Sequence, residues 1–217
     1  MKQFIVIGLG RFGSSVATTL SENGYDVLAI DSNQDKVQAI TDKVTHAVRA
    51  DATDENTLKA LGVGNFDVAV VSIGDNISAN VLCTLILKEL LVPYVIVKSP
   101  HSLHGKVLTK VGADRVVYPE RDMGSRIAHN LISSNVLDYI EFAPEYGVLE
   151  IVPIENMVGK TLKEIGFRSK FNVNVMAIKR GEDLLVSPGA EDKINEGDRI
   201  VLMGKNNSLE KIRDYNG

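Results

Sequence analysis

The sequence predicts an α/β protein with a doubly wound parallel sheet, followed by a crossover helix and a small α+β domain. Three observations lead to this fold class. Short apolar runs alternate with helical patterns as far as Glu120. A G-x-G-x-x-G segment directly follows the first of these runs. In the last third of the chain, short β-type runs separated by glycine-containing turns replace the alternation, as a second domain would require.

The first strand and the loop after it carry the strongest motif. Residues 4–7 are apolar throughout, as a strand buried on both faces requires. In the G-x-G-x-x-G segment, Gly8 permits a tight turn, Gly10 lets backbone N–H groups approach a phosphate, and Gly13 lets the next helix pack closely. The N-terminus of that helix offers unpaired donors and the positive end of its dipole. The loop therefore predicts a phosphate-binding site.

The acidic residue at the end of the second strand completes the motif. A helical pattern over residues 14–22 leads to the apolar run 26–30, which ends in Asp31. At this distance from the glycines, an acidic side chain can accept hydrogen bonds from ribose hydroxyls. The strand–turn–helix–strand context makes the motif far more specific than an isolated glycine pattern. It indicates an adenosine with phosphates and leaves open, at this point, which nucleotide binds.

The alternation continues through a Rossmann-like domain that we assign to residues 1–122. Helices are expected at residues 34–43, 56–61, 77–91 and 103–110, and strands at 46–50, 68–73, 94–98 and 115–118. Ligands of such sheets bind beyond the carboxyl ends of the strands. The residues at or just beyond the carboxyl ends of the third to sixth strands are therefore expected at one pocket: Asp51, Ala52, Thr53, Ser72, Ile73, Gly74, Lys98 and Glu120.

One long helix is expected between the two domains. We assign residues 123–139 to a crossover and dimerisation helix, because an apolar stripe runs along 124–139 and must be buried against its own domain or another subunit. The stripe consists of Ile127, Ala128, Leu131, Ile132, Val136 and Leu137.

The remaining residues, 140–217, are assigned to a small α+β domain. Strands are expected at 148–153, 173–179, 184–187 and 198–203, and short helices at 161–165 and 208–214. A domain of this size is marginal when it folds alone and is expected to pair.

Composition limits the function further. The chain has 217 residues, of which 24% are charged and 44% hydrophobic, and a formal net charge of −4. This acidic balance favours neither nucleic acid nor anionic lipid as a partner. Cys83 is the single cysteine, so no disulfide framework is expected, and its apolar surroundings indicate a buried side chain. The sequence shows neither a signal peptide nor a transmembrane run, which predicts a cytoplasmic protein that reaches a membrane only through a partner.

Five segments in order resemble the RCK family, and within it the cytosolic regulatory subunits of bacterial Ktr potassium-uptake systems. They are Gly8–Gly13, Asp51–Asp54, Tyr118–Met123, Phe167–Phe171 and Ala177–Arg180. The resemblance covers the whole chain, as an RCK-N domain and then an RCK-C domain. It implies a regulator and not an enzyme. Such proteins form homodimers that assemble into an octameric ring beneath a membrane K⁺ translocating subunit, and nucleotide exchange reshapes the ring. The chain departs from the family pattern at Tyr118, where a histidine is common.

Arg11 favours ATP and ADP over NAD(H). A guanidinium at the helix entrance adds a full positive charge and fixed donors beside the dipole end, which suits a terminal phosphate better than a second nucleoside. Arg11 and Phe12 complete the set of loop residues that we expect to contact the nucleotide. Given a dimer, Arg11 is expected to reach from the neighbouring subunit to the γ-phosphate. Asp31 would contact the ribose, and residues 51–53 would lie near the adenine.

Lys98 and Glu120 each allow two interpretations. Lys98 fits a ligand contact and an ion-pair partner equally well. Glu120 could be a helix-start carboxylate or a metal ligand, and the family resemblance implies a divalent cation, Mg²⁺ or Ca²⁺, bound with ATP.

The resemblance also implies a second ligand, cyclic di-AMP, between two RCK-C domains. Ile165, Phe167 and Pro188 would contact the bases, Arg168 the phosphates, and Asn174 a base edge. The alternative is that these residues only form the core of a dimer.

Three other interpretations are weaker. An NAD(H)-dependent oxidoreductase or dinucleotide redox sensor fits the glycine motif, and Tyr94 and Lys98 have the Y-x-x-x-K spacing of short-chain reductases, but they lie on an expected strand. A DNA-binding redox repressor conflicts with the charge and lacks a helix-turn-helix. His101 and His104 could form a metal pair, but they lack nearby carboxylate or cysteine companions.

Overall fold

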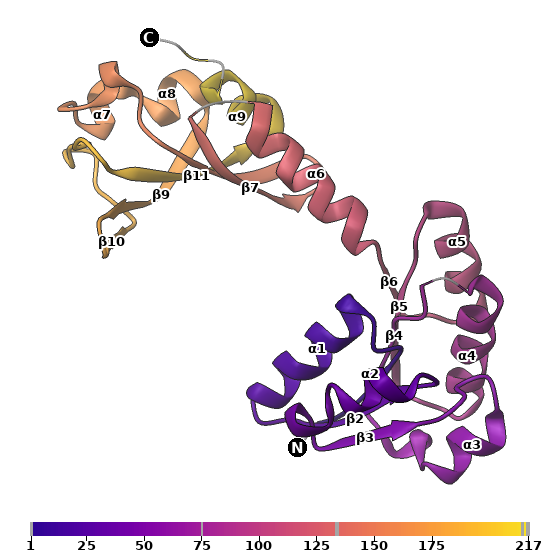
Figure 1. Ribbon diagram of the computed structural model, residues 1–217. Coiled ribbons are helices and arrows are strands. Elements are labelled where there is room, and N and C mark those ends of the chain that lie inside the picture. Colours follow the sequence, from indigo (N-terminus) through magenta and orange to yellow (C-terminus); the bar gives the residue numbers. More distant parts are fainter. Residues whose placement is uncertain (1, 75, 133–134, 214, 216–217) are drawn as a thin grey trace. The chain divides into compact units, whose positions relative to one another are not determined.

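The computed structural model describes residues 2–74, 76–132, 135–213 and 215. The chain divides into two compact units, Met1–Glu120 and Arg121–Gly217. Figure 1 shows the elements of each unit. We describe the units separately.

Unit 1 is built on a six-stranded parallel sheet, which confirms the predicted doubly wound fold. The strand order is β3-β2-β1-β4-β5-β6, so the direction of winding reverses between β1 and β4. The strands are β1 (Gln3–Ile7), β2 (Asp26–Asp31), β3 (His46–Arg49), β4 (Val68–Val71), β5 (Tyr94–Lys98) and β6 (Arg115–Val117). The helices are α1 (Arg11–Glu22), α2 (Gln34–Gln38), α3 (Glu55–Ala60), α4 (Ile77–Glu89) and α5 (Ser102–Val111), with short 3₁₀ turns at Thr41–Lys43 and Val63–Asn65.

Both faces of this sheet are buried, which explains the continuous apolar runs of its strands. Successive side chains point to opposite faces. Ile5 and Ile7 therefore pack into one core cluster, while Val6 joins another cluster with Ala17 of α1. Cys83 belongs to the first cluster, as predicted for a buried side chain, and burial raises the pKa of its thiol to about 12.

The helix expected over residues 34–43 is shorter than predicted. It ends at Gln38, and the chain continues in a 3₁₀ turn. The Ile40 N–H donates to the Val37 carbonyl oxygen, three residues back, at 3.2 Å. This bond tightens the backbone and keeps both apolar side chains buried, so the helical pattern is read correctly but the helix is not continuous.

The prediction of one helix over residues 124–139 is wrong at both ends. Helix α6 spans Pro119–Ile132 and begins with proline, which suits the first helical position. Residues 136–139 instead belong to strand β7 (Val136–Ala143), which pairs antiparallel with β8 (Tyr146–Ile151). Cross-strand pairing therefore overrides the apparent helical periodicity. Residues 133 and 134 and the side chain of Ile132 lie outside what the structure describes.

The predicted apolar stripe is consequently divided between two elements. On α6, Ile127 and Leu131 are 51% and 80% exposed, and Met123, one turn earlier on the same face, is 52% exposed. Val136, on β7, is instead buried in the core of unit 2.

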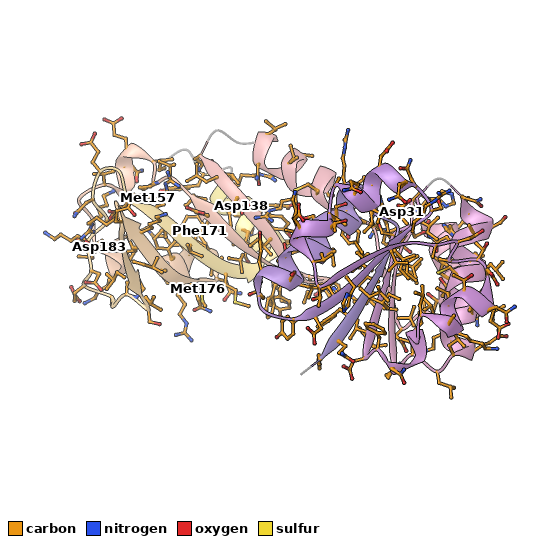
Figure 2. The ribbon with its side chains drawn as sticks, turned by 60° about the horizontal axis from the view of Figure 1, so that its bottom comes forward. Asp31, Asp138, Met157, Phe171, Met176 and Asp183 are labelled. Carbon is orange, nitrogen blue, oxygen red and sulfur yellow. The ribbon has the colours of Figure 1, made fainter. Side chains whose placement is uncertain are left out.

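Unit 2 is an antiparallel sheet with short helices, which confirms the predicted α+β domain. Its strand order is β10-β9-β11-β8-β7, with β9 (Val173–Arg180), β10 (Asp183–Val186) and β11 (Arg199–Lys205). The helices are α7 (Leu162–Ile165), α8 (Phe167–Phe171) and α9 (Asn206–Arg213). Met157, labelled in Figure 2, is 1% exposed and packs into the core with Ile178 and Leu202 of the sheet and Leu209 of α9.

An ion pair ties the end of β9 to the turn before β11. The Asp198 carboxylate is 1% exposed and accepts hydrogen bonds from Arg180 Nε at 2.9 Å and Nη2 at 2.8 Å. It also accepts from the Asn195 N–H at 2.8 Å. The Arg180 guanidinium holds the pKa of Asp198 below its usual value. This contact therefore fixes a turn that the short strands alone would leave weakly held.

Replacing this arginine tests its contribution. Arg180→Met should lower the free energy of unfolding by about 2–3 kcal/mol, because a buried carboxylate loses its charged partner. Since the pKa of Asp198 is lower in the folded than in the unfolded chain, the stabilisation is present above about pH 4 and is lost as the pH falls. Urea unfolding from about pH 7 to about pH 3 should show a flatter pH dependence in the variant. Lys163→Met, which breaks an exposed pair with Glu191, is the control and should change little.

Candidate nucleotide-binding site

The loop between β1 and α1 is shaped by its glycines. Gly8 has φ +92°, and a Cβ there would lie 2.8 Å from the carbonyl carbon of Ser72. A Cβ on Gly13 would overlap the carbonyl oxygen of Gly8. Gly10 differs, because its φ is −73° and nothing lies within 4 Å of its Cβ position. Two of the glycines are therefore required by packing, and the third keeps space open beside the N-terminus of α1.

Two helices direct their N-termini to the same cavity. Helix α1 begins after Gly10, which provides no side-chain cap. Helix α4 begins after Asn76, whose Oδ1 accepts a hydrogen bond from the Ala79 N–H at 2.9 Å. All three of these residues line the cavity. Helix N-termini carry unpaired N–H donors and partial positive charge, so this end of the cavity suits an anion.

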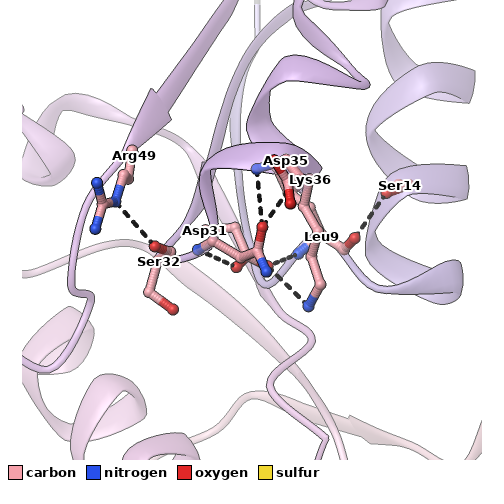
Figure 3. Close-up of polar contacts among 8 residues, drawn as sticks. Leu9, Ser14, Asp31, Ser32, Asp35, Lys36 and Arg49 are labelled. Carbon is pink, nitrogen blue, oxygen red and sulfur yellow. Dashed lines mark hydrogen bonds and ion pairs between the residues drawn. The ribbon is translucent and has the colours of Figure 1, made fainter.

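Asp31 fixes the glycine loop to the end of β2. Figure 3 shows its carboxylate between Leu9 and Lys36. Oδ2 accepts a hydrogen bond from the Leu9 N–H at 2.7 Å and lies 3.5 Å from Lys36 Nζ, while Oδ1 accepts from the Asn33 N–H at 2.8 Å. The residue is 8% exposed. Because a carboxylate offers about four acceptor positions, Asp31 holds the loop in place and retains limited capacity for a ribose hydroxyl.

Asp51 closes a turn at the carboxyl end of β3. Its Oδ1 accepts hydrogen bonds from the Thr53 N–H at 2.9 Å and from Thr53 Oγ1 at 2.7 Å. These bonds hold the pKa of Asp51 below its usual value, so the carboxylate is ionised at neutral pH. Ala52 points into the core. Its contribution to the cavity is therefore mainly through the backbone.

Lys98 and Glu120 form an ion pair at the other side of the cavity. Lys98 Nζ lies 2.5 Å from Glu120 Oε1. The lysine side chain is 16% exposed, whereas that of the glutamate is 70% exposed. The bond from Lys98 holds the pKa of Glu120 below its usual value. The structure thus shows the ion-pair interpretation of Lys98 and also places the residue at the cavity.

The cavity has a volume of about 790 Å³ and lies at the carboxyl ends of the parallel strands. It gathers the predicted site residues except Gly13, which acts from beneath through packing: Gly8, Gly10, Arg11, Phe12, Asp31, Asp51, Ala52, Thr53, Ser72, Ile73, Gly74, Lys98 and Glu120. The site prediction did not include Ser32, Lys36, Asn76 and Ala79. Asn76 could have been found from its position as the N-cap before an apolar helix.

Charges around the cavity are arranged mostly as pairs. Lys36 faces Asp31, and Lys98 faces Glu120. Within the described part of the chain, Arg11 is the one basic side chain lining the cavity for which no ion pair is found. Its exposed guanidinium stands at the first position of α1. The arrangement leaves a cation available beside the open space at Gly10.

The residues of the alternative interpretations are placed differently. Tyr94 and Lys98 are both on β5, four residues apart, which separates their Cα atoms by about 13 Å. His101 caps α5 through Nδ1, which accepts from the His104 N–H at 3.3 Å. His104 is 3% exposed, and burial lowers its pKa. Among the described residues, no group of three or more His, Cys, Asp or Glu side chains could hold a metal ion.

The RCK-C residues predicted to bind cyclic di-AMP are also separated by burial. Ile165 and Phe167 are 6% and 2% exposed and belong to the core of unit 2. Arg168 and Asn174 are exposed, on α8 and β9, and Pro188 is half-buried. A cavity of about 800 Å³ in unit 2 lies elsewhere, between α6, β7, β8 and α9.

None of the helices, over the residues described, is long and apolar enough to cross a bilayer.

Comparison with known families places both units. Residues 4–119 match the TrkA-N domain, and residues 148–217 match the TrkA-C domain. The chain is 49% identical over 203 residues to the Ktr system potassium uptake protein C of Bacillus subtilis, covering 94% of this chain and 92% of the relative. It is 44% identical over 213 residues to the Ktr system potassium uptake protein A of the same organism, covering 98% and 96%.

A solved structure shows the same fold. The GsuK channel superimposes on all of this chain with a TM-score of 0.71 at 18% identity. The chain spans 39% of the length of that channel protein. At this identity the likeness concerns the fold alone.

Two glycine variants should separate the contribution of the loop to stability from its contribution to ligand binding. Gly10→Ala should leave the midpoint of thermal unfolding nearly unchanged and weaken nucleotide binding at least tenfold, because the new methyl occupies open space beside the α1 N-terminus. Gly13→Ala should lower the unfolding midpoint by several degrees, because its Cβ overlaps the Gly8 carbonyl oxygen. Differential scanning fluorimetry and titration calorimetry measure the two effects. Equal loss of stability in both variants would contradict this assignment. Gly124→Ala, in open space on α6, is the control.

Proposed function

This chain belongs to the family of RCK proteins built from TrkA-N and TrkA-C domains, and on that premise we propose that it is a nucleotide-regulated subunit that controls potassium uptake through a membrane partner. The observation that carries the proposal is the cavity of unit 1, where two helix N-termini and Arg11 surround open space at Gly10. The Ktr relatives support the potassium-uptake role, because the similarity extends over nearly the whole of each chain.

We infer that the regulatory ligands are ATP and ADP. Arg11 is exposed at the start of α1, and no ion pair to it is found among the described residues. A guanidinium in that position binds phosphate oxygens with directed donors. The two nucleotides differ by a terminal phosphate, and a switch between two states requires such a differential contact. NAD(H), in a dinucleotide sensor or an oxidoreductase, is the alternative ligand. The Ktr relatives, which are potassium uptake proteins, support a regulatory role over a catalytic one.

A divalent cation fits this site only together with a phosphate ligand. Glu120 lines the cavity, and its Oε1 already accepts from Lys98. Mg²⁺ and Ca²⁺ need six or more oxygen ligands, which phosphates and water would have to complete. We therefore propose Glu120 as the protein ligand of a cation that binds with ATP and partly neutralises its charge.

The proposed assembly is a homodimer that builds an octameric ring. A ring of dimers needs two separate self-association surfaces. Exposed apolar side chains occur on two separate helical regions in the described chain. One is the α6 face, with Met123, Ile127 and Leu131, and the other lies on α4 and α5, with exposed Leu82, Leu85, Leu103 and Val107. Contiguous apolar surface of this kind is typical of interfaces. The ring would lie in the cytoplasm, at the inner face of the membrane, bound to a Ktr-type K⁺ translocating subunit.

Arg11→Ala should weaken ATP binding about ten- to a hundredfold and ADP binding much less. The reason is the loss of one charged hydrogen bond, worth about 1.5–3 kcal/mol, to a phosphate that ADP lacks. Titration calorimetry with ATP, ADP and NADH measures the three affinities. NADH bound more tightly than ATP, with Arg11→Ala indifferent, would replace the proposal by a dinucleotide sensor.

Potassium uptake provides the functional readout for the same variant. In cells that lack other potassium transporters, the wild-type chain expressed with a Ktr-type membrane subunit should support growth at low potassium. Arg11→Ala should reduce this growth, whereas Arg115→Ala, which removes an exposed arginine of β6 that does not line the cavity, is a charge-matched control for the nucleotide effect. Growth that is independent of the chain would contradict the regulatory role.

We also propose a cyclic di-AMP site on the RCK-C domain, formed by Arg168, Asn174 and Pro188, which remain accessible. Arg168→Ala and Asn174→Ala should each lower cyclic di-AMP affinity by tenfold or more, because each removes a polar contact to the phosphates or a base. Calorimetry with cyclic di-AMP measures the loss, and Lys170→Ala, on the same short helix, is the control. The absence of heat with the wild-type chain, or equal heat with all variants, would limit these residues to a structural role.

A further inference from the structure

The ion pair between Lys98 and Glu120 connects the cavity to the first turn of α6. Lys98 is the last residue of β5, and Glu120 is the second residue of α6, the helix that carries the chain out of unit 1. Both side chains line the cavity together with Gly10 and Arg11. A hydrogen bond of 2.5 Å between Lys98 Nζ and Glu120 Oε1 joins them. Besides Arg11, the cavity thus holds a second cation, Lys98, that is already paired with a residue of α6.

The backbone of Lys98 is held by a buried side chain, so a change of partner requires only the lysine side chain to move. The Asn80 side chain is fully buried and donates through Nδ2 to the carbonyl oxygens of Lys98, at 3.0 Å, and of Ile73, at 2.6 Å. This amide ties the ends of β4 and β5 together beneath the cavity. A lysine ammonium on a four-carbon stem can reorient from such a fixed base without moving the strand.

We propose that Lys98 exchanges partners when the cavity fills: in the empty site it neutralises Glu120, and a bound polyphosphate takes its ammonium and releases the Glu120 carboxylate. This inference rests on the proposed ATP site and states how occupancy is passed to α6. A terminal phosphate carries more negative charge than one carboxylate, so it competes well for the ammonium. Glu120 is 70% exposed, and water can solvate it once it is released.

The exchange has a consequence that a simple cation site does not have. In the empty protein, Glu120 competes with the nucleotide for Lys98. Removing the glutamate charge should therefore strengthen nucleotide binding even when no divalent cation is present, and this gain should depend on Lys98.

The experiment is a double-mutant cycle on ATP affinity, measured by titration calorimetry in excess EDTA. Lys98→Met should weaken ATP about tenfold or more, the loss expected for one charged hydrogen bond. Glu120→Gln should strengthen ATP roughly threefold, the factor that corresponds to a partly exposed ion pair. In the Lys98→Met background, the gain from Glu120→Gln should be smaller. Lys98→Gln, which keeps a polar side chain, repeats the test if the methionine variant is unstable.

Repulsion between Glu120 and the phosphates predicts the opposite coupling. Without Lys98 the glutamate would be unscreened, and its removal would then improve ATP binding as much as, or more than, in the wild type. That result, or ATP affinity unchanged by Lys98→Met, overturns the exchange. Lys36→Met is the matched control. Lys36 lines the same cavity but pairs with Asp31, so its removal should leave the gain from Glu120→Gln intact.

The two hypotheses fail in different ways. A wild-type chain that shows no heat with ATP overturns the proposed nucleotide. ATP binding that depends on Arg11 and ignores Lys98 overturns the exchange alone.

Discussion

The close approach of α1 to the loop at the end of β1 is the constraint on which the cavity depends. It is possible only because Gly13 has no Cβ that would overlap the Gly8 carbonyl oxygen. The approach brings the N-terminus of α1 to the point where the winding of the sheet reverses between β1 and β4. Asp31 then holds the loop through the Leu9 N–H. The glycine loop with the N-terminus of α1, the end of β2 and the end of β4 are thereby held around one open space.

The polar residues of the cavity already form hydrogen bonds and ion pairs within the chain. The Asp31 carboxylate accepts hydrogen bonds from backbone N–H groups of the chain. Asp51 closes a turn with Thr53, and Lys98 neutralises Glu120. Each group is therefore positioned in advance, and binding has little side-chain freedom to remove. What remains for an incoming anion is Arg11 and the backbone donors of two helices.

The fold of unit 1 could be predicted because its strands are buried on both faces and its glycine loop is specific. The order of the elements, and the cavity residues at the strand ends, follow from that pattern. Strand β7 could not be predicted, because Val136 and Leu137 continue the spacing of α6 and only the pairing with β8 makes them a strand. Likewise, the apolar character of Phe167 does not distinguish a ligand contact from the core position that it occupies. The ion pair of Lys98 joins residues 22 positions apart and is invisible to local patterns.

The pairing of charges around the cavity also determines how an anion arrives there. A neighbouring lysine and carboxylate act at a distance as a dipole, whose field fades faster than that of a single charge, and salt screens what remains beyond about 10 Å. The chain as a whole has a formal charge of −4. Long-range attraction therefore does little to hasten the encounter with a negatively charged molecule. Any selection among anions would therefore take place after contact, at short range, where two molecules that differ by one group can be distinguished.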